Sequence, residues 1–299
     1  GNHAGNPSTY FSPYHNKNLK DGPKGEYLMD RLAHEAEVYL DTVGKERPFF
    51  LYYATYAVHT PLEAKKDLVE KYKTKAATKD HFNPVYAAMV ENMDKSVGSI
   101  LNAVERNGIS ENTLIIFTSD NGGVYDISHQ TPLRAGKGSF YEGGIREPFI
   151  IYMKGRYEGG KEFDVPVSQL DLYPTLVEVA GAKPGKQLDG LSLLPFLNKN
   201  KKKYLTDRSL FFHFPAYLEG GNAETHDLKF RTRPVSVIID KGWKLIKNYE
   251  DDSKELYNLK NDPSEKINLA ETNEAKVKYL LTRLNTWINK EHAPIPQPK

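Results

Sequence analysis

Two short apolar runs enclose a long polar loop that is rich in glycine, and this arrangement constrains the fold more than any other feature. The first run, residues 113–118, is apolar and β-branched, and residues 149–153 form the second. Short apolar runs bounded by turn residues predict buried β-strands. Asp120 and Asn121 directly follow the first run. Because ligands of open α/β sheets bind beyond the carboxyl ends of the strands, we expect the chemistry of the protein in this loop.

The remaining patterns predict an α/β domain followed by a smaller α+β unit. Apolar residues recur every three or four positions over residues 26–43 and 84–107, which predicts amphipathic helices. Residues 49–54 predict a further buried strand, so strand, helix and strand alternate as in a parallel sheet with crossover helices. Residues 167–180 predict a helix with Pro174 at a kink or in its first turn, and residues 181–200 resemble a loop.

A change of pattern near residue 200 predicts a domain boundary, with residues 1–200 forming the α/β domain and residues 201–299 a small subdomain. We expect an antiparallel sheet and a terminal helix there, at residues 209–214, 235–239, 243–247, 255–259 and 273–289. Asp240-Lys241-Gly242 between two of these runs is a hairpin signal.

The composition excludes several classes of protein. The 41 basic and 39 acidic residues give a net charge of +2, which argues against a nucleic-acid-binding surface. No apolar run approaches the roughly 20 residues needed to span a bilayer. The sequence contains no cysteine, so disulfides and cysteine nucleophiles are excluded from it.

Taken one at a time, the polar motifs favour ordinary structural roles. Asp-Asn-Gly after a strand is most often a turn, because these residues tolerate positive φ. His59-Thr60-Pro61 fits a loop, since the residue before proline is held extended. Lys137, between two glycines, fits a solvated surface lysine.

In combination and in this order, the motifs resemble the type I sulfatases, the formylglycine-dependent enzymes of the alkaline phosphatase superfamily. The similar segments are residues 118–123, 132–138 and 141–148, with further similarity at 57–62, 169–175, 188–193, 242–245 and 255–259. The resemblance implies an α/β fold with a mixed, mostly parallel sheet flanked by helices. It also implies a small C-terminal subdomain with an antiparallel sheet.

The resemblance assigns roles to four residues. Asp120 and Asn121 are similar to half of the family's Ca²⁺ site, with Mg²⁺ as the alternative ion, and hard cations bind such oxygen donors. Lys137 resembles the lysine that contacts the sulfate, where an ammonium offsets charge on the sulfuryl oxygens. His59 resembles the histidine near the leaving oxygen, which in its protonated form stabilises charge or donates a proton.

Three further residues are candidates for substrate binding, each with a structural alternative. His129 and Arg134 lie between the metal ligands and Lys137, so they are placed to reach sugar hydroxyls or acid groups. Arg134 could equally pair with a nearby carboxylate. His213 could enter the pocket from the C-terminal subdomain, but a satisfied core histidine is at least as good an interpretation.

The sequence lacks several features of the family pattern. It contains no Cys/Ser-x-Pro-x-Arg motif, whose first residue becomes formylglycine, and Asn6-Pro7-Ser8-Thr9 lacks the arginine. The early Asp-Asp pair that completes the metal site is also missing. We therefore expect the C-terminal part of a longer sulfatase, inactive by itself and completed by an N-terminal part that carries formylglycine. A relative without a nucleophile is the alternative.

The resulting functional hypothesis is a sulfuric ester hydrolase of the arylsulfatase type, acting on a sulfated small molecule or glycan. The alternatives are a phosphoesterase or phosphonate hydrolase of the same superfamily, and a non-catalytic module that binds a cation and an anion. The family resemblance also implies a periplasmic or secreted location.

Overall fold

The computed structural model describes residues 9–44, 46–157, 159–199 and 201–296, and the chain divides into two units. The first unit contains Gly1–Phe117, Asp126–His129 and Phe149–Glu158. The second contains Thr118–Tyr125, Gln130–Pro148 and Gly159–Lys299. Asn6-Pro7-Ser8 lies outside the described residues. The domain boundary near residue 200 remains a prediction.

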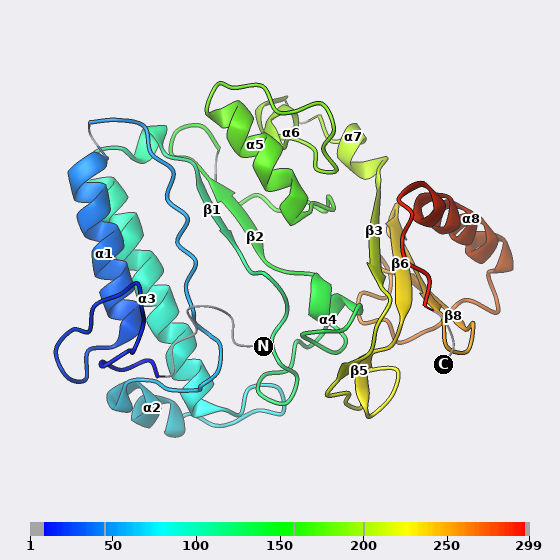
Figure 1. The fold of residues 1–299 in the computed structure, drawn as a ribbon, viewed down its shortest axis with the longest axis horizontal. Coiled ribbons are helices and arrows are strands. Elements are labelled where there is room, and N and C mark those ends of the chain that lie inside the picture. The colour runs from blue at the N-terminus through cyan, green and yellow to red at the C-terminus, as the bar shows by residue number, and fades with distance from the viewer. Residues whose placement is uncertain (1–8, 45, 158, 200, 297–299) are drawn as a thin grey trace. The chain divides into compact units, whose positions relative to one another are not determined.

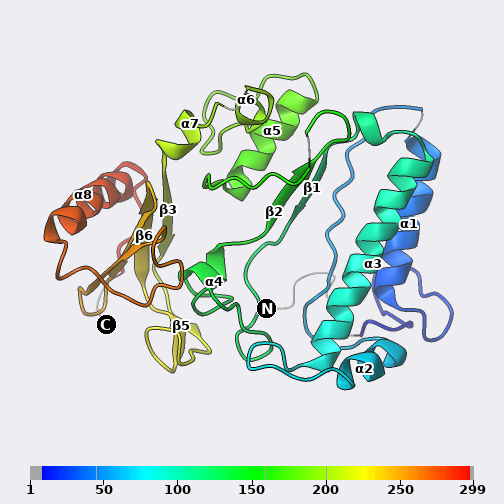
Figure 2. The ribbon, with the colours of Figure 1, turned by 180° about the vertical axis from the view of Figure 1, so that it is seen from behind.

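Two long helices dominate the first unit, α1 (Leu28–Val43) and α3 (Pro84–Arg106), and they lie side by side in Figures 1 and 2. Leu40 of α1 packs against Ala103 and Val104 of α3. The side chain of Asn83 caps α3 by accepting hydrogen bonds from the amides of Val85 and Tyr86. Both helices were predicted from their apolar periodicity. Two shorter elements, α2 (Lys66–Lys73) and η1 (Ser110–Asn112), were not.

The two apolar runs that enclose the polar loop form strands β1 (Ile115–Thr118) and β2 (Phe149–Tyr152), as predicted, and the two strands pair with each other. The predicted burial is wrong, since β1 is only partly buried and Ile150 and Tyr152 of β2 are exposed. The predicted strand at residues 49–54 is wrong, since no strand is assigned there. Phe50 is 69% exposed and Tyr52 is 80% exposed, so alternate side chains of this segment are not buried. A segment is a β-strand only when a neighbour accepts its backbone hydrogen bonds, and no described strand pairs with this one.

The second unit is built on a four-stranded antiparallel sheet in the order β3-β6-β7-β8. Its strands are β3 (Ser209–Phe214), β6 (Val235–Asp240), β7 (Trp243–Asn248) and β8 (Lys254–Asn258). Helix α8 (Glu274–Lys290) lies on one face of the sheet (Figure 2), where its Leu280 and Leu284 pack in one cluster with Leu245. All five elements were predicted. Lys241 and Gly242 both have positive φ, as the hairpin signal requires.

The opposite face of this sheet holds the polar loop. Ala135 and Tyr141 of the loop share a buried cluster with Val237, Ile246 and Tyr257 of the sheet. The loop also contains the short helix α4 (Glu142–Ile145). Because sheet side chains alternate between faces, one sheet anchors both α8 and the segment that carries Lys137.

The remaining elements of the second unit are short. They are η2 (Gln169–Asp171), α5 (Leu172–Val179), α6 (Leu194–Lys199), α7 (Lys203–Thr206), β4 (Leu218–Glu219) and β5 (Phe230–Thr232). Pro174 lies in the first turn of α5, as one of the two predicted arrangements requires. The region 181–200 was predicted as a loop but includes α6. The α/β fold with a small antiparallel subdomain is confirmed.

Candidate functional site

Glycines bring the segment after β1 into contact with the segment around Lys137. The amide of Lys137 donates to the carbonyl of Gly123 at 2.8 Å, and the amide of Gly122 donates to the carbonyl of Gly144 at 3.3 Å. A Cβ added to Gly122 would lie 1.9 Å from the carbonyl oxygen of Gly143. Only glycine permits such an approach of two backbones. These contacts join the Lys137 backbone to Gly123, which follows Asp120 and Asn121 by two to three residues in the chain.

Asp120 and Asn121 present two oxygen-bearing side chains at the end of β1. The Asn121 amide nitrogen donates to Asp120 Oδ1 at 2.5 Å, so the two side chains touch. The Ser119 hydroxyl donates to the carbonyl of Asn121 at 3.0 Å, and Gln169 Nε2 donates to the carbonyl of Ser119 at 2.5 Å. These bonds fix the backbone of the turn and leave the Asp120 side chain exposed.

Lys137 carries a cation that no described residue neutralises. Its side chain is partly buried, and its ammonium makes no hydrogen bond or ion pair within the described part of the chain. Lys244 in the same unit shows the contrast, because it is fully buried between Glu142 at 3.1 Å and Glu265 at 2.8 Å. Lys244 is thus structural, whereas the charge of Lys137 is available to a ligand.

Glu147 is a further acidic residue at this site for which the sequence predicted no role. Its Oε1 is buried and has no hydrogen-bond partner among the described residues. Burial, and after it the charge of Asp120, raises the pKa of Glu147 to about 7. Glu147 lies within the segment 141–148 that resembles the sulfatases. A glutamate in this segment did not by itself predict a position near Asp120.

The residues at the end of β1 fit part of a divalent metal site. Asp120 and Asn121 supply the carboxylate and amide oxygens that Ca²⁺ and Mg²⁺ prefer, and the unpaired Glu147 Oε1 near Asp120 is a buried acceptor that a cation would satisfy. Within the described ranges, no group of three or more His, Cys, Asp or Glu side chains could hold a metal. These residues therefore provide only a part of a coordination shell.

His59 and His129 belong to the first unit. The His59 side chain is exposed, and its Nδ1 lies 3.0 Å from the carbonyl oxygen of Thr60. Its own carbonyl accepts a hydrogen bond from the Tyr10 hydroxyl at 3.0 Å, which anchors the loop. Nδ1 of His129 lies 3.4 Å from Asp80 Oδ1, and its ring meets that of Phe82 edge to face. Their predicted substrate roles remain predictions.

Arg134 and His213, in the second unit, both have local partners. Arg134 donates to the carbonyl of Glu224 at 2.7 Å and to the hydroxyl of Tyr257 at 3.0 Å. The two ring nitrogens of His213 lie 2.7 Å from the Ser236 hydroxyl and 2.8 Å from the carbonyl of Pro294. These contacts agree with the structural alternatives, and substrate binding by the two residues stays a prediction.

Arg134 lies at the edge of a buried network centred on Glu255. The hydroxyls of Tyr257 and Tyr141 donate to Glu255 Oε2 at 2.6 and 2.8 Å, and His226 Nδ1 lies 3.6 Å from its Oε1. Burial opposes ionisation, but the polar contact with His226 and the hydrogen bonds from the two tyrosines outweigh it and lower the pKa of Glu255 to about 2. The network ties the Lys137 segment to the sheet, because Tyr141 is in that segment.

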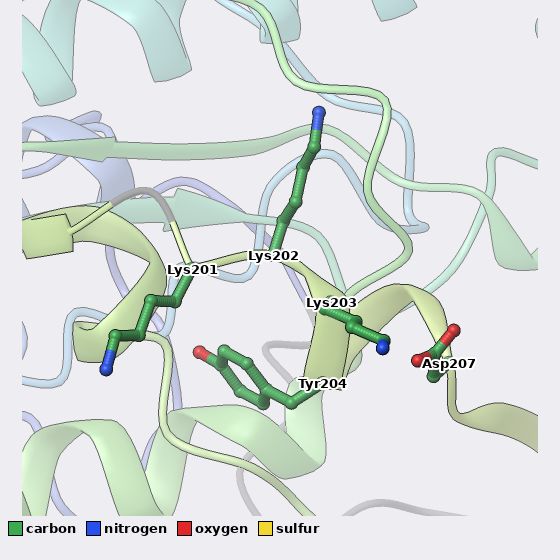
Figure 3. A pocket seen from close by; sticks show the side chains of 5 residues that line it. All are labelled: Lys201, Lys202, Lys203, Tyr204 and Asp207. Carbon is green, nitrogen blue, oxygen red and sulfur yellow. The ribbon is translucent and has the colours of Figure 1, made fainter.

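The lysine cluster near residue 200 does not form a second anion site. Lys201, Lys202 and Lys203 line a surface hollow with Tyr204 and Asp207. Figure 3 shows that the three lysine side chains point in different directions rather than toward a common centre. Their exposed side chains fit a solvated surface.

Fold and site together define a class of protein: an α/β protein with a carboxylate and an amide side chain at a strand end, and a lysine without a described partner in the adjoining loop. The sequence profile of the family described as "Sulfatase" matches residues 2–182. The profile described as "N-sulphoglucosamine sulphohydrolase, C-terminal" matches residues 136–292. The chain belongs to the sulfatase family, whose members are metal-dependent enzymes.

Individual relatives agree with this assignment. A sulfatase of Formosa agariphila is 36% identical over 92% of this chain and 52% of its own length. Mouse N-acetylgalactosamine-6-sulfatase is 31% identical over 70% of this chain and 44% of its own. The crystal structure of Ps i-CgsB, also solved with k-i-k-neocarrahexaose, has a TM-score of 0.75 and 34% identity, covering 90% of this chain and 56% of that one.

The chain spans about half the length of the curated relatives it matches. None of the helices in the described part of the chain combines the length and the apolar character that a membrane crossing requires.

Proposed function

We propose that the whole protein hydrolyses sulfate esters. The observation that carries the proposal is the hydrogen bond from the Lys137 amide to the Gly123 carbonyl. It links the segment that carries the oxygen donors Asp120 and Asn121 to the segment that carries the unpaired Lys137 ammonium. A sulfate ester needs both, because its oxygens carry negative charge and its bridging oxygen gains charge as the S–O bond breaks.

In this proposal each residue has a defined task. Asp120 and Asn121 hold a divalent cation, Ca²⁺ in preference to Mg²⁺, and the cation supplies Lewis-acid stabilisation of the sulfate oxygens when bound. Lys137 binds the sulfate and offsets the charge that develops on it. His59 stabilises or protonates the leaving oxygen. His129, Arg134 and His213 are retained as substrate-binding candidates, although Arg134 and His213 already have partners in the fold.

The remaining machinery is proposed to come from an N-terminal part of the same protein, which supplies the formylglycine nucleophile and the other metal ligands. The coverage of about half of each relative supports this proposal. The exposure of Phe50, Tyr52 and Ile150 supports it as well, because apolar side chains at alternate positions of extended segments are usually covered.

We further propose that the substrate is a sulfated glycan and that the protein acts in the periplasm or outside the cell. The names of the relatives support a glycan substrate, since one relative is an N-acetylgalactosamine-6-sulfatase and the structure of another was solved with k-i-k-neocarrahexaose. The predicted division into a catalytic domain, residues 1–200, and a subdomain, residues 201–299, is kept as part of the proposal.

Parallel assays of the intact protein on 4-nitrophenyl sulfate and 4-nitrophenyl phosphate test the function. The proposal predicts faster turnover of the sulfate, loss of that turnover after removal of divalent metal, and recovery on adding Ca²⁺. Faster turnover of the phosphate would identify the phosphoesterase of the same superfamily instead. Turnover of neither, together with retained binding of sulfate, would identify a non-catalytic relative.

A further inference from the structure

Arg231 is an arginine that the sequence did not single out and that the fold directs to the Lys137 segment. It lies in β5, which pairs with β4. The pairing runs from Leu218 with Thr232 to Glu219 with Phe230, so Arg231 is the extra residue of a β-bulge. Bulges change the direction of a side chain and are frequent next to active sites. Arg231 Nη1 lies 3.5 Å from the carbonyl oxygen of Lys137.

Two glycines provide the space for the Arg231 side chain. A Cβ added to Gly138 would lie 2.9 Å from Arg231 Cδ, and one added to Gly220 would lie 2.7 Å from its Nε and Nη2. Both glycines have positive φ, at 85° and 91°. Other residues rarely adopt such φ values, so backbone conformation and side-chain space both require glycine at these positions.

The charge of Arg231 is not neutralised within the described part of the chain. Its Nε is buried without a hydrogen-bond partner, and the hydrogen bond that its Nη1 donates to the Lys137 carbonyl is long, at 3.5 Å. Arg233, two residues further along, pairs instead with both Asp227 and Glu250, the latter at 2.6 Å. An uncompensated guanidinium that is partly buried is costly unless a ligand supplies the missing anion.

We propose that Arg231 binds a second anionic group of the substrate, next to the sulfate that Lys137 holds. The inference rests on the proposed function and narrows the substrate class to a glycan with at least two anionic groups. The second group is a carboxylate or another sulfate, since a guanidinium donates paired hydrogen bonds to either. Arg231 thereby distinguishes polyanionic sugars from simple sulfate esters.

The test compares three ligands of the intact protein: 4-nitrophenyl sulfate with a single anion, a neocarrahexaose whose anions are all sulfates, and a chondroitin sulfate tetrasaccharide that also has carboxylates. Arg231→Ala is expected to lower kcat/KM for a polyanionic substrate by about 10- to 100-fold more than for 4-nitrophenyl sulfate, as the loss of a charge-assisted hydrogen bond implies. Arg231→Lys should recover part of the difference. The oligosaccharide whose kcat/KM depends on Arg231 identifies the second anionic group as sulfate or carboxylate.

Lys229→Ala is the matched control, because it removes one positive charge from the same hairpin at an exposed side chain that lies over the Phe230 ring. It should leave all three rates unchanged. An equal loss on all three substrates in Arg231→Ala would contradict the proposal, and so would the absence of any loss.

Calorimetric titration with the oligosaccharides separates this inference from the proposed function, because it does not require turnover. Wild-type protein should bind at least one of them about tenfold more tightly than Arg231→Ala. If the wild type binds an oligosaccharide more tightly than Arg231→Ala but hydrolyses no sulfate ester, the proposed function is wrong while the anion site stands. If affinity is the same in both proteins, the anion site is wrong.

Discussion

At the scale of single residues, side chains of the same type have different tasks because their partners differ. Lys244 is enclosed by Glu142 and Glu265, whereas the Lys137 ammonium has no partner among the described residues. Arg233 is paired with two carboxylates, whereas Arg231 is not paired with any described one. The residue type alone does not show which lysine or arginine is neutralised by carboxylates and which is not.

The oxygen donors give the first prediction. Asp120→Ala in the intact protein should abolish metal-dependent turnover, because it removes a carboxylate ligand, and should leave the fold intact, because the Asp120 side chain is exposed. Turnover of 4-nitrophenyl sulfate and the Ca²⁺ dissociation constant are the measurements, with circular dichroism as the control for folding. Near-wild-type turnover in calcium-containing buffer would contradict the assignment of a metal ligand.

The second prediction concerns Lys137. Lys137→Ala should lower kcat for 4-nitrophenyl sulfate by about 10²- to 10³-fold, the effect of losing one donor to a developing anion. Lys241→Ala is a suitable control, since it removes the same charge from an exposed hairpin turn. If both variants retain the wild-type rate, Lys137 is a surface residue.

At the scale of elements, glycine contacts and one buried network fix the loop that carries the site. Gly122 lets the segment after β1 approach the carbonyl of Gly143 in α4, and Gly136 lets the Lys137 segment approach the carbonyl of Gly123. Tyr141 then ties this loop to the C-terminal sheet through Glu255. The position of Lys137 therefore depends on contacts that contain no catalytic group.

Paired glycine substitutions test the dependence on close backbone contact. Gly122→Ala should lower the midpoint of thermal unfolding and cost about 2 kcal/mol or more, because the new Cβ would lie 1.9 Å from a carbonyl oxygen. Gly98→Ala, in the interior of α3 with open space around the added methyl group, should instead stabilise by about 0.5–1 kcal/mol. Equal effects of the two substitutions would show that the loop relaxes around the methyl group.

The Glu255 network gives a pH dependence. The pKa of Glu255 is lowered from 4.5 to about 2 in the folded state, so the carboxylate stabilises the fold at pH values above about 4.5. As pH falls from about 4.5 to about 2, this contribution, on the order of 3 kcal/mol, should be lost.

Unfolding free energies of wild type and Glu255→Gln, measured between pH 2 and pH 7, check this expectation. The two curves should be well separated at pH 7 and should converge toward pH 2. A constant separation over the whole range would mean that the ionisation of Glu255 does not contribute.

At the scale of the whole molecule, the sequence predicted elements with strong periodicity and missed those that depend on distant partners. Helices α1, α3 and α8 and the four strands of the C-terminal sheet follow from their patterns. Helix α2 was missed because it buries only Leu68, and β4 and β5 were missed because each has two or three residues. The run at residues 49–54 has strand composition, but no pairing neighbour is described.

The same limit applies to the site. The motifs placed Asp120, Asn121 and Lys137 in one loop, and in the structure the amide of Lys137 donates to the carbonyl of Gly123, close to Asn121 in the chain. Glu147 and Arg231 could not be predicted from the sequence. The burial of Glu147 near Asp120 and the β-bulge that contains Arg231 both depend on tertiary packing, which the spacing of residues in the sequence does not show. Arg134 and His213 each have partners in the fold, and their predicted role in substrate binding stays a prediction.

The central claim is that a cation held by Asp120 and Asn121 and the ammonium of Lys137 act on one tetrahedral anion. The most direct measurement is the affinity of the intact protein for inorganic sulfate, with and without Ca²⁺, in wild type and in Lys137→Ala. The account predicts that removing Ca²⁺ and removing the lysine each weaken sulfate binding, with a joint effect that differs from the sum of the two. Sulfate affinity that depends on neither would contradict it.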